Sequence, residues 1–351
     1  MTDRKTQHGM VDVTVVGGGP VGLFAVFYAG LRGARTRVID RLEHLGGQCG
    51  NLYPEKVIFD VAGIPEIPGE GLVEALARQM QQFDPDVVMG EQVEEIRQLA
   101  PGGPFHLVTD RGVYPSRRVI LALGLGAFTP RRLSWIPRFD DLEGRGISYF
   151  VKDMSRFQDA NVLIIGGGDS AVDWAMEADR RGKHVVQIHR SDVFQAHEGN
   201  LARLLHSNVE LRPFHELVRI EGEEKVEGAV IMDNRSLEET HLRVDIVVPA
   251  VGFLHNLETV RRWGITVVGN SIPVDHRMQT NIPGIFAAGD IVIHPSKMKL
   301  IATGAGEAAI AANAAADEIV PTNRCLYNVA GDRYLGKKLS DIAARVASGE
   351  L

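Results

Sequence analysis

The chain of 351 residues predicts an α/β protein with two Rossmann-like, three-layer nucleotide-binding domains. The first observation is an internal repeat, because residues 14–40 (TVVGGGPVGLFAVFYAGLRGARTRVID) align without a gap to residues 163–189 (LIIGGGDSAVDWAMEADRRGKHVVQIH). The second is that each copy places a glycine-rich loop between a β-rich run and a helical stretch, which is the order of a βαβ unit. The third is the chain length, which accommodates two domains at about 150 residues each.

The composition excludes several other classes of protein. Glycine accounts for 38 of the 351 residues, which is about 11% against roughly 7% in average chains. These glycines do not follow the Gly-X-Y period of collagen. No run approaches the roughly 18 apolar residues of a membrane helix, and the first residues lack the apolar core of a secretion signal. We therefore expect a cytoplasmic protein without membrane contact. The net charge of −7 and the scattered basic residues disfavour nucleic acid as a partner.

The two cysteines limit the redox chemistry of the chain itself. Cys49 and Cys325 are too few and too far apart for a disulfide scaffold, a zinc site or an iron–sulfur cluster. We therefore expect no metal site, and any redox chemistry must come from a bound cofactor.

In the first copy, a strand over residues 11–16 leads into the glycine-rich loop and then into a helix. Gly17 permits the tight turn, Gly19 lets the backbone approach a pyrophosphate, and Gly22 lets the helix pack closely on the strand. Pro20 completes this loop. The pyrophosphate would then lie at the positive end of the helix.

The two copies differ where the second strand of each unit ends. In the first copy this strand ends on Asp40, which is placed to accept hydrogen bonds from a ribose hydroxyl. In the second copy His189 and Arg190 stand there, and a guanidinium can bind the 2′-phosphate of NADPH, which an acid would repel. These differences predict a flavoprotein with FAD in the first site and NADPH in the second, although Arg190 could also be a solvated surface cation. The loop of the NADPH site comprises Gly166, Gly168, Asp169 and Ser170.

Six runs of sequence carry a resemblance to a known family. They are VVGGGPVGLFAVFYAGLRG, LGGQCGNLYPEKVIFDVAGIP, GAFTPRRL, IIGGGDSAVDWA, HRSDVFQAHE and GIFAAGDI, in this order. Through these runs, the part of the chain from about Val11 to Glu318 resembles the thioredoxin-reductase-like flavoproteins. Within that group it resembles the ferredoxin–NADP reductases of the same type. Thioredoxin reductases carry a CxxC pair where this chain has residues 150–153 (FVKD). Without that dithiol, electrons cannot pass from the flavin to a protein disulfide.

The resemblance implies further contacts with FAD. Gly47 and Gln48 belong to a loop that approaches the cofactor, where Gln48 offers both an amide donor and an acceptor. Tyr53 would stack on the flavin, and Asp290 would accept hydrogen bonds from the ribityl hydroxyls. Core packing remains an alternative for Tyr53, and a turn or helix-cap role remains one for Asp290. By the same analogy Val93, expected at the end of a short strand, would touch the adenine side, and Phe128 would lie near FAD, unless it is a linker contact.

The order of the motifs implies that the NADPH domain is inserted into the FAD domain. Apolar strands running into glycine, over residues 119–126 and 245–252, mark the two crossings. We expect a helix over residues 304–319 whose positive end stabilises the reduced flavin. The expected plan is an FAD domain of residues 1–120 and 250–320, an NADPH domain of residues 121–249, and a C-terminal extension of residues 321–351 that covers the flavin or contacts a dimer partner.

The resemblance implies a ferredoxin–NADP reductase that forms a homodimer. NADPH would deliver a hydride to FAD, and the reduced FAD would pass single electrons to ferredoxin or flavodoxin. Hydride transfer requires no side-chain acid, base or nucleophile, so no catalytic residue is assigned. One alternative is a sibling NADPH-dependent flavoprotein that reduces a low-molecular-weight disulfide, a quinone or free flavin. Another is a non-catalytic redox sensor, against which two full cofactor sites argue. The candidates for docking an acidic ferredoxin are Arg117, Arg118, Arg131, Arg132 and Arg138.

Overall fold

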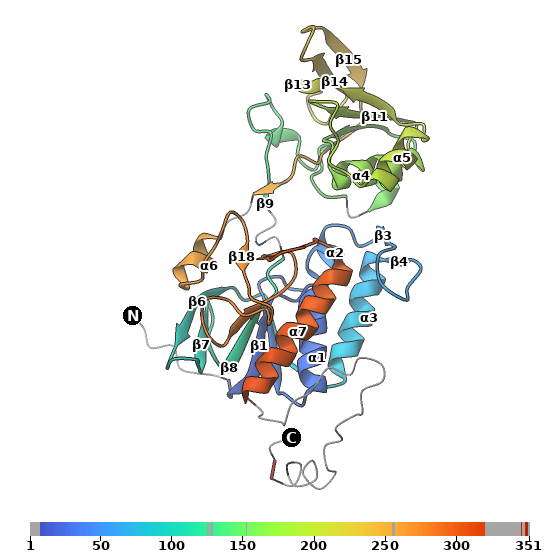
Figure 1. The fold of residues 1–351 in the computed structure, drawn as a ribbon. Coiled ribbons are helices and arrows are strands. Elements are labelled where there is room, and N and C mark those ends of the chain that lie inside the picture. The colour runs from blue at the N-terminus through green and yellow to red at the C-terminus, as the bar shows by residue number, and fades with distance from the viewer. Residues whose placement is uncertain are drawn as a thin grey trace. The chain divides into compact units, whose positions relative to one another are not determined.

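A computed structural model of the chain describes residues 8–124, 126, 129–151, 153–254, 257–319, 345, 348 and 349. The chain divides into two compact units, of which the first takes in Met1–Gly126 and Asn256–Leu351 and the second takes in Ala127–His255. Each unit contains a parallel sheet with helices packed on it, as the sequence predicts (Figure 1). Phe128 and nearly all of the extension predicted over residues 321–351 lie outside the described residues.

The sheet of the first unit is centred on β1 (Val11–Val16), which is buried along almost its whole length, as in a strand covered on both faces. The parallel strands follow the order β5-β2-β1-β8, with β19 also paired to β8, and β7 and β6 continue the sheet in antiparallel fashion. The other strands of the unit are β2 (Thr36–Asp40), β3 (Val57–Ile58), β4 (Ile67–Pro68), β5 (Asp86–Met89), β6 (Val93–Gln98), β7 (Phe105–Thr109), β8 (Val113–Leu121), β18 (Ile272–Pro273), β19 (Ile285–Ala287) and β20 (Val292–Ile293).

Three long helices, α1, α3 and α7, cover one face of this sheet (Figure 1). Val13 and Val15 of β1 pack there with Leu23 of α1 and Ala311 of α7, whereas Val16 belongs to the core on the opposite face. This division follows from the two-residue period of a strand. The helices are α1 (Pro20–Leu31), α2 (Gly47–Asn51), α3 (Gly69–Gln81), α6 (Glu258–Arg262) and α7 (Ile301–Ile319), the last beginning before the predicted Gly304.

The second unit repeats the βαβ arrangement and adds an antiparallel sheet. Its parallel sheet has the order β12-β11-β10-β16. The antiparallel strands β13, β14 and β15 contribute Leu217 and Ile231 to a core shared with Leu163 and Ile165 of β10. The elements are β9 (Thr129–Pro130), β10 (Asn161–Ile165), α4 (Asp169–Asp179), β11 (His184–His189), α5 (Glu198–Leu205), β12 (Glu210–Pro213), β13 (His215–Glu221), β14 (Gly228–Asp233), β15 (Glu239–Arg243), β16 (Ile246–Pro249) and β17 (Phe253–Leu254), with 3-10 turns at Asp140–Leu142 and Met154–Phe157.

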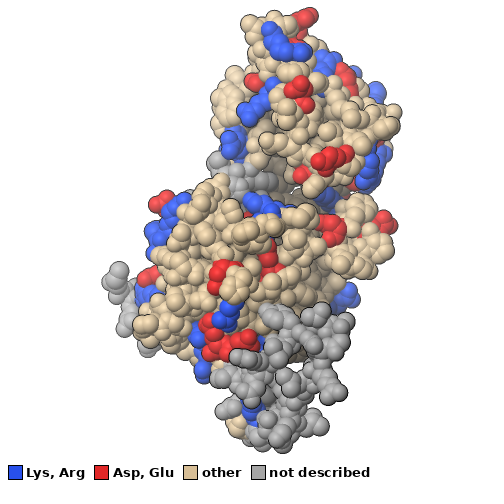
Figure 2. All heavy atoms as spheres, in the orientation of Figure 1, with Lys and Arg blue, Asp and Glu red and all other residues tan. Residues whose placement is uncertain are grey.

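The surface carries charges of both signs. On the face drawn in Figure 2, lysine and arginine lie interspersed with aspartate and glutamate on both units. Among the described residues, no helix has the length and apolar character needed to cross a membrane.

Two glycines inside helices of the first unit allow a test of the packing. A Cβ on Gly22 of α1 would lie 1.9 Å from the carbonyl oxygen of Gly17, whereas a Cβ on Gly306 of α7 would meet nothing within 4 Å. We predict that Gly22→Ala lowers the free energy of unfolding by about 1–3 kcal/mol because the backbone must move. Gly306→Ala should be neutral or raise it by about 0.5–1 kcal/mol, since alanine favours a helix. Thermal unfolding followed by circular dichroism measures both changes, and equal transition temperatures would contradict the prediction.

Candidate nucleotide-binding sites

The first glycine-rich loop turns the chain from β1 into α1 with no room for side chains. Gly17 has a φ of +110°, and a Cβ there would lie 2.2 Å from the carbonyl oxygen of Ala122, just beyond β8. Gly19 is the N-cap of α1 and Pro20 stands at the start of the helix, where no side chain caps the first N–H groups. These N–H groups remain available to an anion at the positive end of the helix.

A second stretch of glycine backbone lies against this loop. The N–H of Gly46 donates a hydrogen bond of 2.8 Å to the carbonyl of Gly18. A Cβ on Gly47 would lie 2.9 Å from the Cα of Gly19. The two loops therefore form a cradle of bare backbone that side chains would fill. Such a cradle fits the pyrophosphate of a dinucleotide.

Asp40 lies at the carboxyl end of β2, directly beside the loop. One carboxylate oxygen accepts a 2.6 Å hydrogen bond from the N–H of Gly18, and the other accepts one of 2.8 Å from Leu42. Burial raises the pKa of Asp40, while the N–H groups of Leu42 and Gly18 act in the opposite direction. The carboxylate is thus fixed in place and keeps lone pairs for a ribose diol.

Gln48 and Tyr53 lie on and just after α2. The amide nitrogen of Gln48 is next to Gly124, at 3.5 Å from the position of a Cβ there. The hydroxyl of Tyr53 is 3.6 Å from the Sγ of Cys49, and the Nζ of Lys56 lies 5.3 Å from the centre of the tyrosine ring. Burial raises the pKa of Tyr53 well above its usual range. Its phenol therefore stays neutral.

Asp290 follows β19 through Ala288 and Gly289. Its carboxylate makes no hydrogen bond with the described residues. Burial raises its pKa, and the charges of Lys297 and Lys299 partly offset this effect. A half-buried carboxylate without a partner fits the hydroxyls of a bound cofactor, and this agrees with the cradle at Gly19.

Beneath Asp290 lies a buried charge network that the sequence analysis did not predict. Glu307 of α7 is 5% exposed and accepts a 2.8 Å hydrogen bond from the N–H of Gly289. Its two oxygens also accept hydrogen bonds of 2.7 and 2.8 Å from the Nζ of Lys297, and one accepts a bond of 2.9 Å from the Nε2 of His294. Glu307 therefore holds the turn that presents Asp290. No motif marked it, because its partners come from a loop that folds back on the helix.

Two further predicted contacts have different outcomes. Val93 is buried, but it opens β6 instead of ending a short strand, since the preceding strand β5 stops at Met89. Only three residues, 90–92, separate the two strands, so the sequence did not show where the first one ends. Phe128 lies outside the described residues.

The second glycine-rich loop reproduces the geometry of the first. Gly166 has a φ of +141°, and a Cβ there would lie 2.4 Å from the carbonyl oxygen of Ala250, just beyond β16. Gly168 is the N-cap of α4, and again no side chain caps the helix. Asp169 accepts a 2.9 Å hydrogen bond from the N–H of His197, and Ser170 is exposed beside it.

His189 and Arg190 end β11 in different environments. The imidazole of His189 packs on Gly167, where a Cβ would lie 2.5 Å from the ring, and its Nε2 donates to the carbonyl of Val193 at 3.2 Å. Burial lowers the pKa of His189, so the ring is neutral around neutral pH. Arg190 is exposed, and its carbonyl accepts a 2.8 Å hydrogen bond from Asn234. Arg190 is therefore the cation available to a phosphate, while His189 supports the loop.

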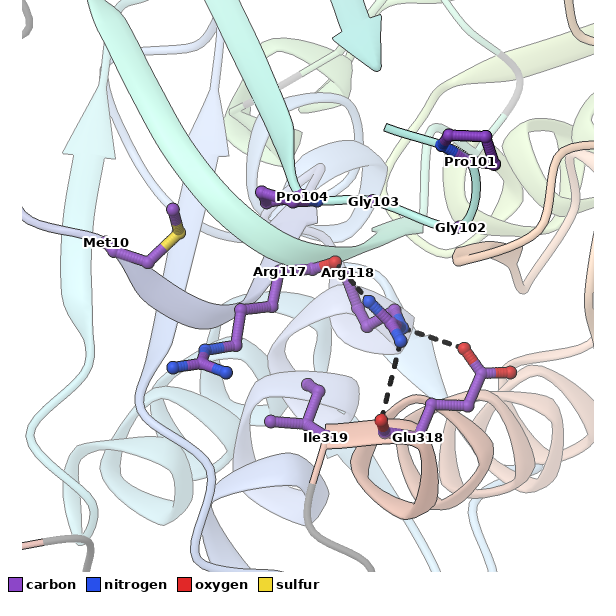
Figure 3. A pocket seen from close by; sticks show the side chains of 9 residues that line it. All are labelled: Met10, Pro101, Gly102, Gly103, Pro104, Arg117, Arg118, Glu318 and Ile319. Carbon is purple, nitrogen blue, oxygen red and sulfur yellow. Dashed lines mark hydrogen bonds and ion pairs between the residues drawn. The ribbon is translucent and has the colours of Figure 1, made fainter. Parts of the chain in front are cut away.

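A hollow of about 520 Å³ lies elsewhere on the first unit (Figure 3). It is near the amino end of β1, away from the glycine loops, and Arg118 at its wall pairs with Glu318 at 2.7 Å. The hollow is lined by Met10, Pro101, Gly102, Gly103, Pro104, Arg117, Arg118, Glu318 and Ile319.

Among the residues that the structure describes, no group of three or more histidine, cysteine, aspartate or glutamate side chains could hold a metal ion.

Comparison with known proteins agrees with this geometry. The model of the pyridine nucleotide-disulphide oxidoreductase family matches residues 11–316. The chain is 44% identical to ferredoxin–NADP reductase 2 of Chloroherpeton thalassium over 324 residues, 91% of this chain and 94% of the relative. It is 45% identical to the ferredoxin–NADP reductase of Thermus thermophilus over 311 residues, 87% of this chain and 92% of the relative. The thioredoxin reductase of Lactococcus lactis, 28% identical, superimposes with a TM-score of 0.77 over 89% of this chain and 100% of that structure.

Asp40 can be tested against another aspartate of the same sheet. We predict that Asp40→Ala weakens FAD binding by about tenfold or more, because a charged hydrogen-bond acceptor for the ribose contributes about 1.5–3 kcal/mol. Asp12, at the amino end of β1, accepts a comparable 2.9 Å hydrogen bond from the N–H of Arg35, so Asp12→Ala is the matched control. The measurement is the FAD dissociation constant from flavin fluorescence. Equal weakening by both substitutions would contradict the role of Asp40.

Proposed function

Because the chain belongs to the pyridine nucleotide-disulphide oxidoreductase family, we infer that it is an FAD-dependent ferredoxin–NADP reductase. FAD and NADPH are its cofactors, as the sequence predicts. The observation that carries the inference is the pair of backbone cradles at Gly17 and Gly166, one followed by a carboxylate at Asp40 and the other by the guanidinium of Arg190. When bound, FAD accepts a hydride from NADPH and releases its electrons singly.

The sequence contains no CxxC dithiol that could relay the electrons. Cys49 is fully buried, and burial raises the pKa of its thiol, which keeps it protonated and unreactive. The other cysteine, Cys325, is separated from it by 275 intervening residues and follows α7 in the sequence, so the two do not form a CxxC pair. Residues 150–153, where thioredoxin reductases carry that pair, are Phe-Val-Lys-Asp. We therefore propose that electrons leave directly from the flavin.

The residues of the first site hold and orient the cofactor. The carboxylates of Asp40 and Asp290 would accept hydrogen bonds from the ribose and ribityl hydroxyls, and Tyr53 would cover the flavin. The first turn of α7 contains no acidic residue, so the positive end of this helix is not offset there. We propose that this end stabilises the negative charge of the reduced flavin.

The site in the second unit would select the nicotinamide cofactor. The uncapped end of α4 would receive the pyrophosphate, and Arg190 would receive the 2′-phosphate of NADPH.

We also propose that flavodoxin can replace ferredoxin as the electron carrier. We further propose that the protein is a homodimer in the cytoplasm. The unpaired thiol of Cys49 agrees with a reducing compartment.

Anaerobic spectrophotometry tests the proposed activity. NADPH should bleach the flavin absorption, and oxidised ferredoxin added afterwards should restore it, because the electrons have a one-electron acceptor. Failure of NADPH to bleach the flavin would overturn the assignment of both sites. Restoration by a small disulfide or a quinone, with none by ferredoxin, would show instead that the enzyme is a sibling reductase.

The selectivity of the second site depends on Arg190. We predict that Arg190→Ala raises the Michaelis constant for NADPH about tenfold, because a charged hydrogen bond to phosphate contributes about 1.5–3 kcal/mol, and leaves that for NADH little changed. Arg180→Ala is the control, since Arg180 follows the last residue of α4 and pairs with Glu177 of that helix at 2.6 Å. Equal changes for NADPH and NADH in the Arg190 variant would refute the contact with the 2′-phosphate.

A further inference from the structure

A cationic and apolar loop follows Asp290 in the first unit. It runs from Ile293 to Lys299 (IHPSKMK) and leads into α7. Ile293 and Met298 are 44% and 52% exposed, and Lys299 is exposed as well. No acidic residue occurs between Asp290 and Glu307. Exposed apolar side chains next to a lysine, without a neighbouring acid in the sequence, are typical of a surface that receives a partner.

Hydrogen bonds with residues of α7 hold the loop in place. His294 and Lys297 turn inward to the carboxylate of Glu307, at 2.9 and 2.7 Å. The hydroxyl of Thr303 donates a 2.8 Å hydrogen bond to the carbonyl of Met298. Because these anchors alternate with the exposed side chains, the exposed ones are presented outward. A fixed loop loses little conformational entropy when a partner binds.

The charge that the loop presents outward is that of Lys299. The side chain of Lys297 is 7% exposed and its charge is matched by Glu307, whereas Lys299 forms no ion pair with any residue that the structure describes. Lys297 and the N–H of Gly289 bind the same carboxylate, that of Glu307, so the loop lies beside the turn that carries Asp290. The exposed cation is therefore near the carboxylate that we propose to hold the flavin.

The arginines that the sequence suggested for docking are mostly engaged elsewhere. Arg117 pairs with Asp12 at 3.3 Å and Arg118 with Glu318 at 2.7 Å. Arg132 lies 3.2 and 2.8 Å from two acidic side chains, and Arg138 donates a hydrogen bond to a backbone carbonyl. The charges of Arg117, Arg118 and Arg132 are therefore matched by carboxylates within the chain.

We propose that the Ile293–Lys299 loop is the docking surface for a small acidic one-electron carrier protein, an inference that rests on the proposed function. Its apolar pair, Ile293 and Met298, would lie at the centre of the contact and Lys299 at its rim, facing a carboxylate of the carrier. Encounters of electron carriers bury little area, less than about 1,200 Å², so a short loop supplies a substantial part of the contact. Docking beside Asp290 brings the carrier close to the flavin, from which one electron passes to the oxidised carrier.

Stopped-flow mixing of the NADPH-reduced holoenzyme with an oxidised acidic ferredoxin tests this surface. Lys299→Glu should lower the second-order rate constant of flavin reoxidation about tenfold at an ionic strength of about 0.01 M, where the Debye length is about 30 Å. At about 1 M salt, where the Debye length is about 3 Å, the difference from the unaltered enzyme should disappear. Lys299→Arg should retain the rate, because it keeps the charge.

Arg78 supplies the matched control. It is exposed in the last turn of α3, near the carboxyl end of the helix. It forms no ion pair with the described residues. Arg78→Glu should leave the rate unchanged. Equal loss in the Lys299 and Arg78 variants, no loss in Lys299→Glu, or a loss that high salt does not diminish would each overturn the docking surface. If the unaltered enzyme does not reduce ferredoxin at all, the proposed function fails, and the docking surface fails with it.

Discussion

The structure depends on two turns where the backbone leaves no room for a Cβ. At Gly17 and Gly166 the chain leaves a buried strand with positive φ. A Cβ on either glycine would lie 2.2 or 2.4 Å from the carbonyl oxygen of an alanine just beyond the neighbouring strand. Only glycine fits, because any larger residue would meet both the strained φ and the carbonyl. No side chain caps the start of the helix that follows either turn, so its first N–H groups stay available to an anion. Both nucleotide sites arise from that single arrangement.

A second layer of interactions gives the first site its charge. Asp40 is held by two backbone N–H groups, and Asp290 follows a turn held by Glu307. Glu307 in turn requires Lys297, because a buried carboxylate without a cation would be costly. The same lysine fixes the loop that exposes Met298 and Lys299. The turn that carries Asp290 and the loop that we propose for carrier docking are therefore linked through one buried carboxylate.

The features predicted from sequence are those set by local spacing. The strand over residues 11–16, the helix that follows its glycine-rich loop and the strand that ends on Asp40 agree with the structure, because glycine and apolar runs mark their limits. The start of α7 at Ile301 was missed, since the glycines at 304 and 306 obscured the helix. The network at Glu307 and the antiparallel sheet of the second unit depend on contacts between segments far apart in the chain, which no local pattern specifies. The side-chain roles of Tyr53, Asp290 and Arg190 remain proposals.

The central claim is that electrons pass directly between the flavin and a one-electron protein carrier, without a thiol relay. The most direct measurement is an anaerobic titration of the holoenzyme and NADP with reduced ferredoxin, following the absorbance of NADPH. The account predicts one NADPH formed for every two electrons delivered, at the same yield after alkylation of accessible thiols. Absence of NADPH, or its loss after alkylation, would contradict the account.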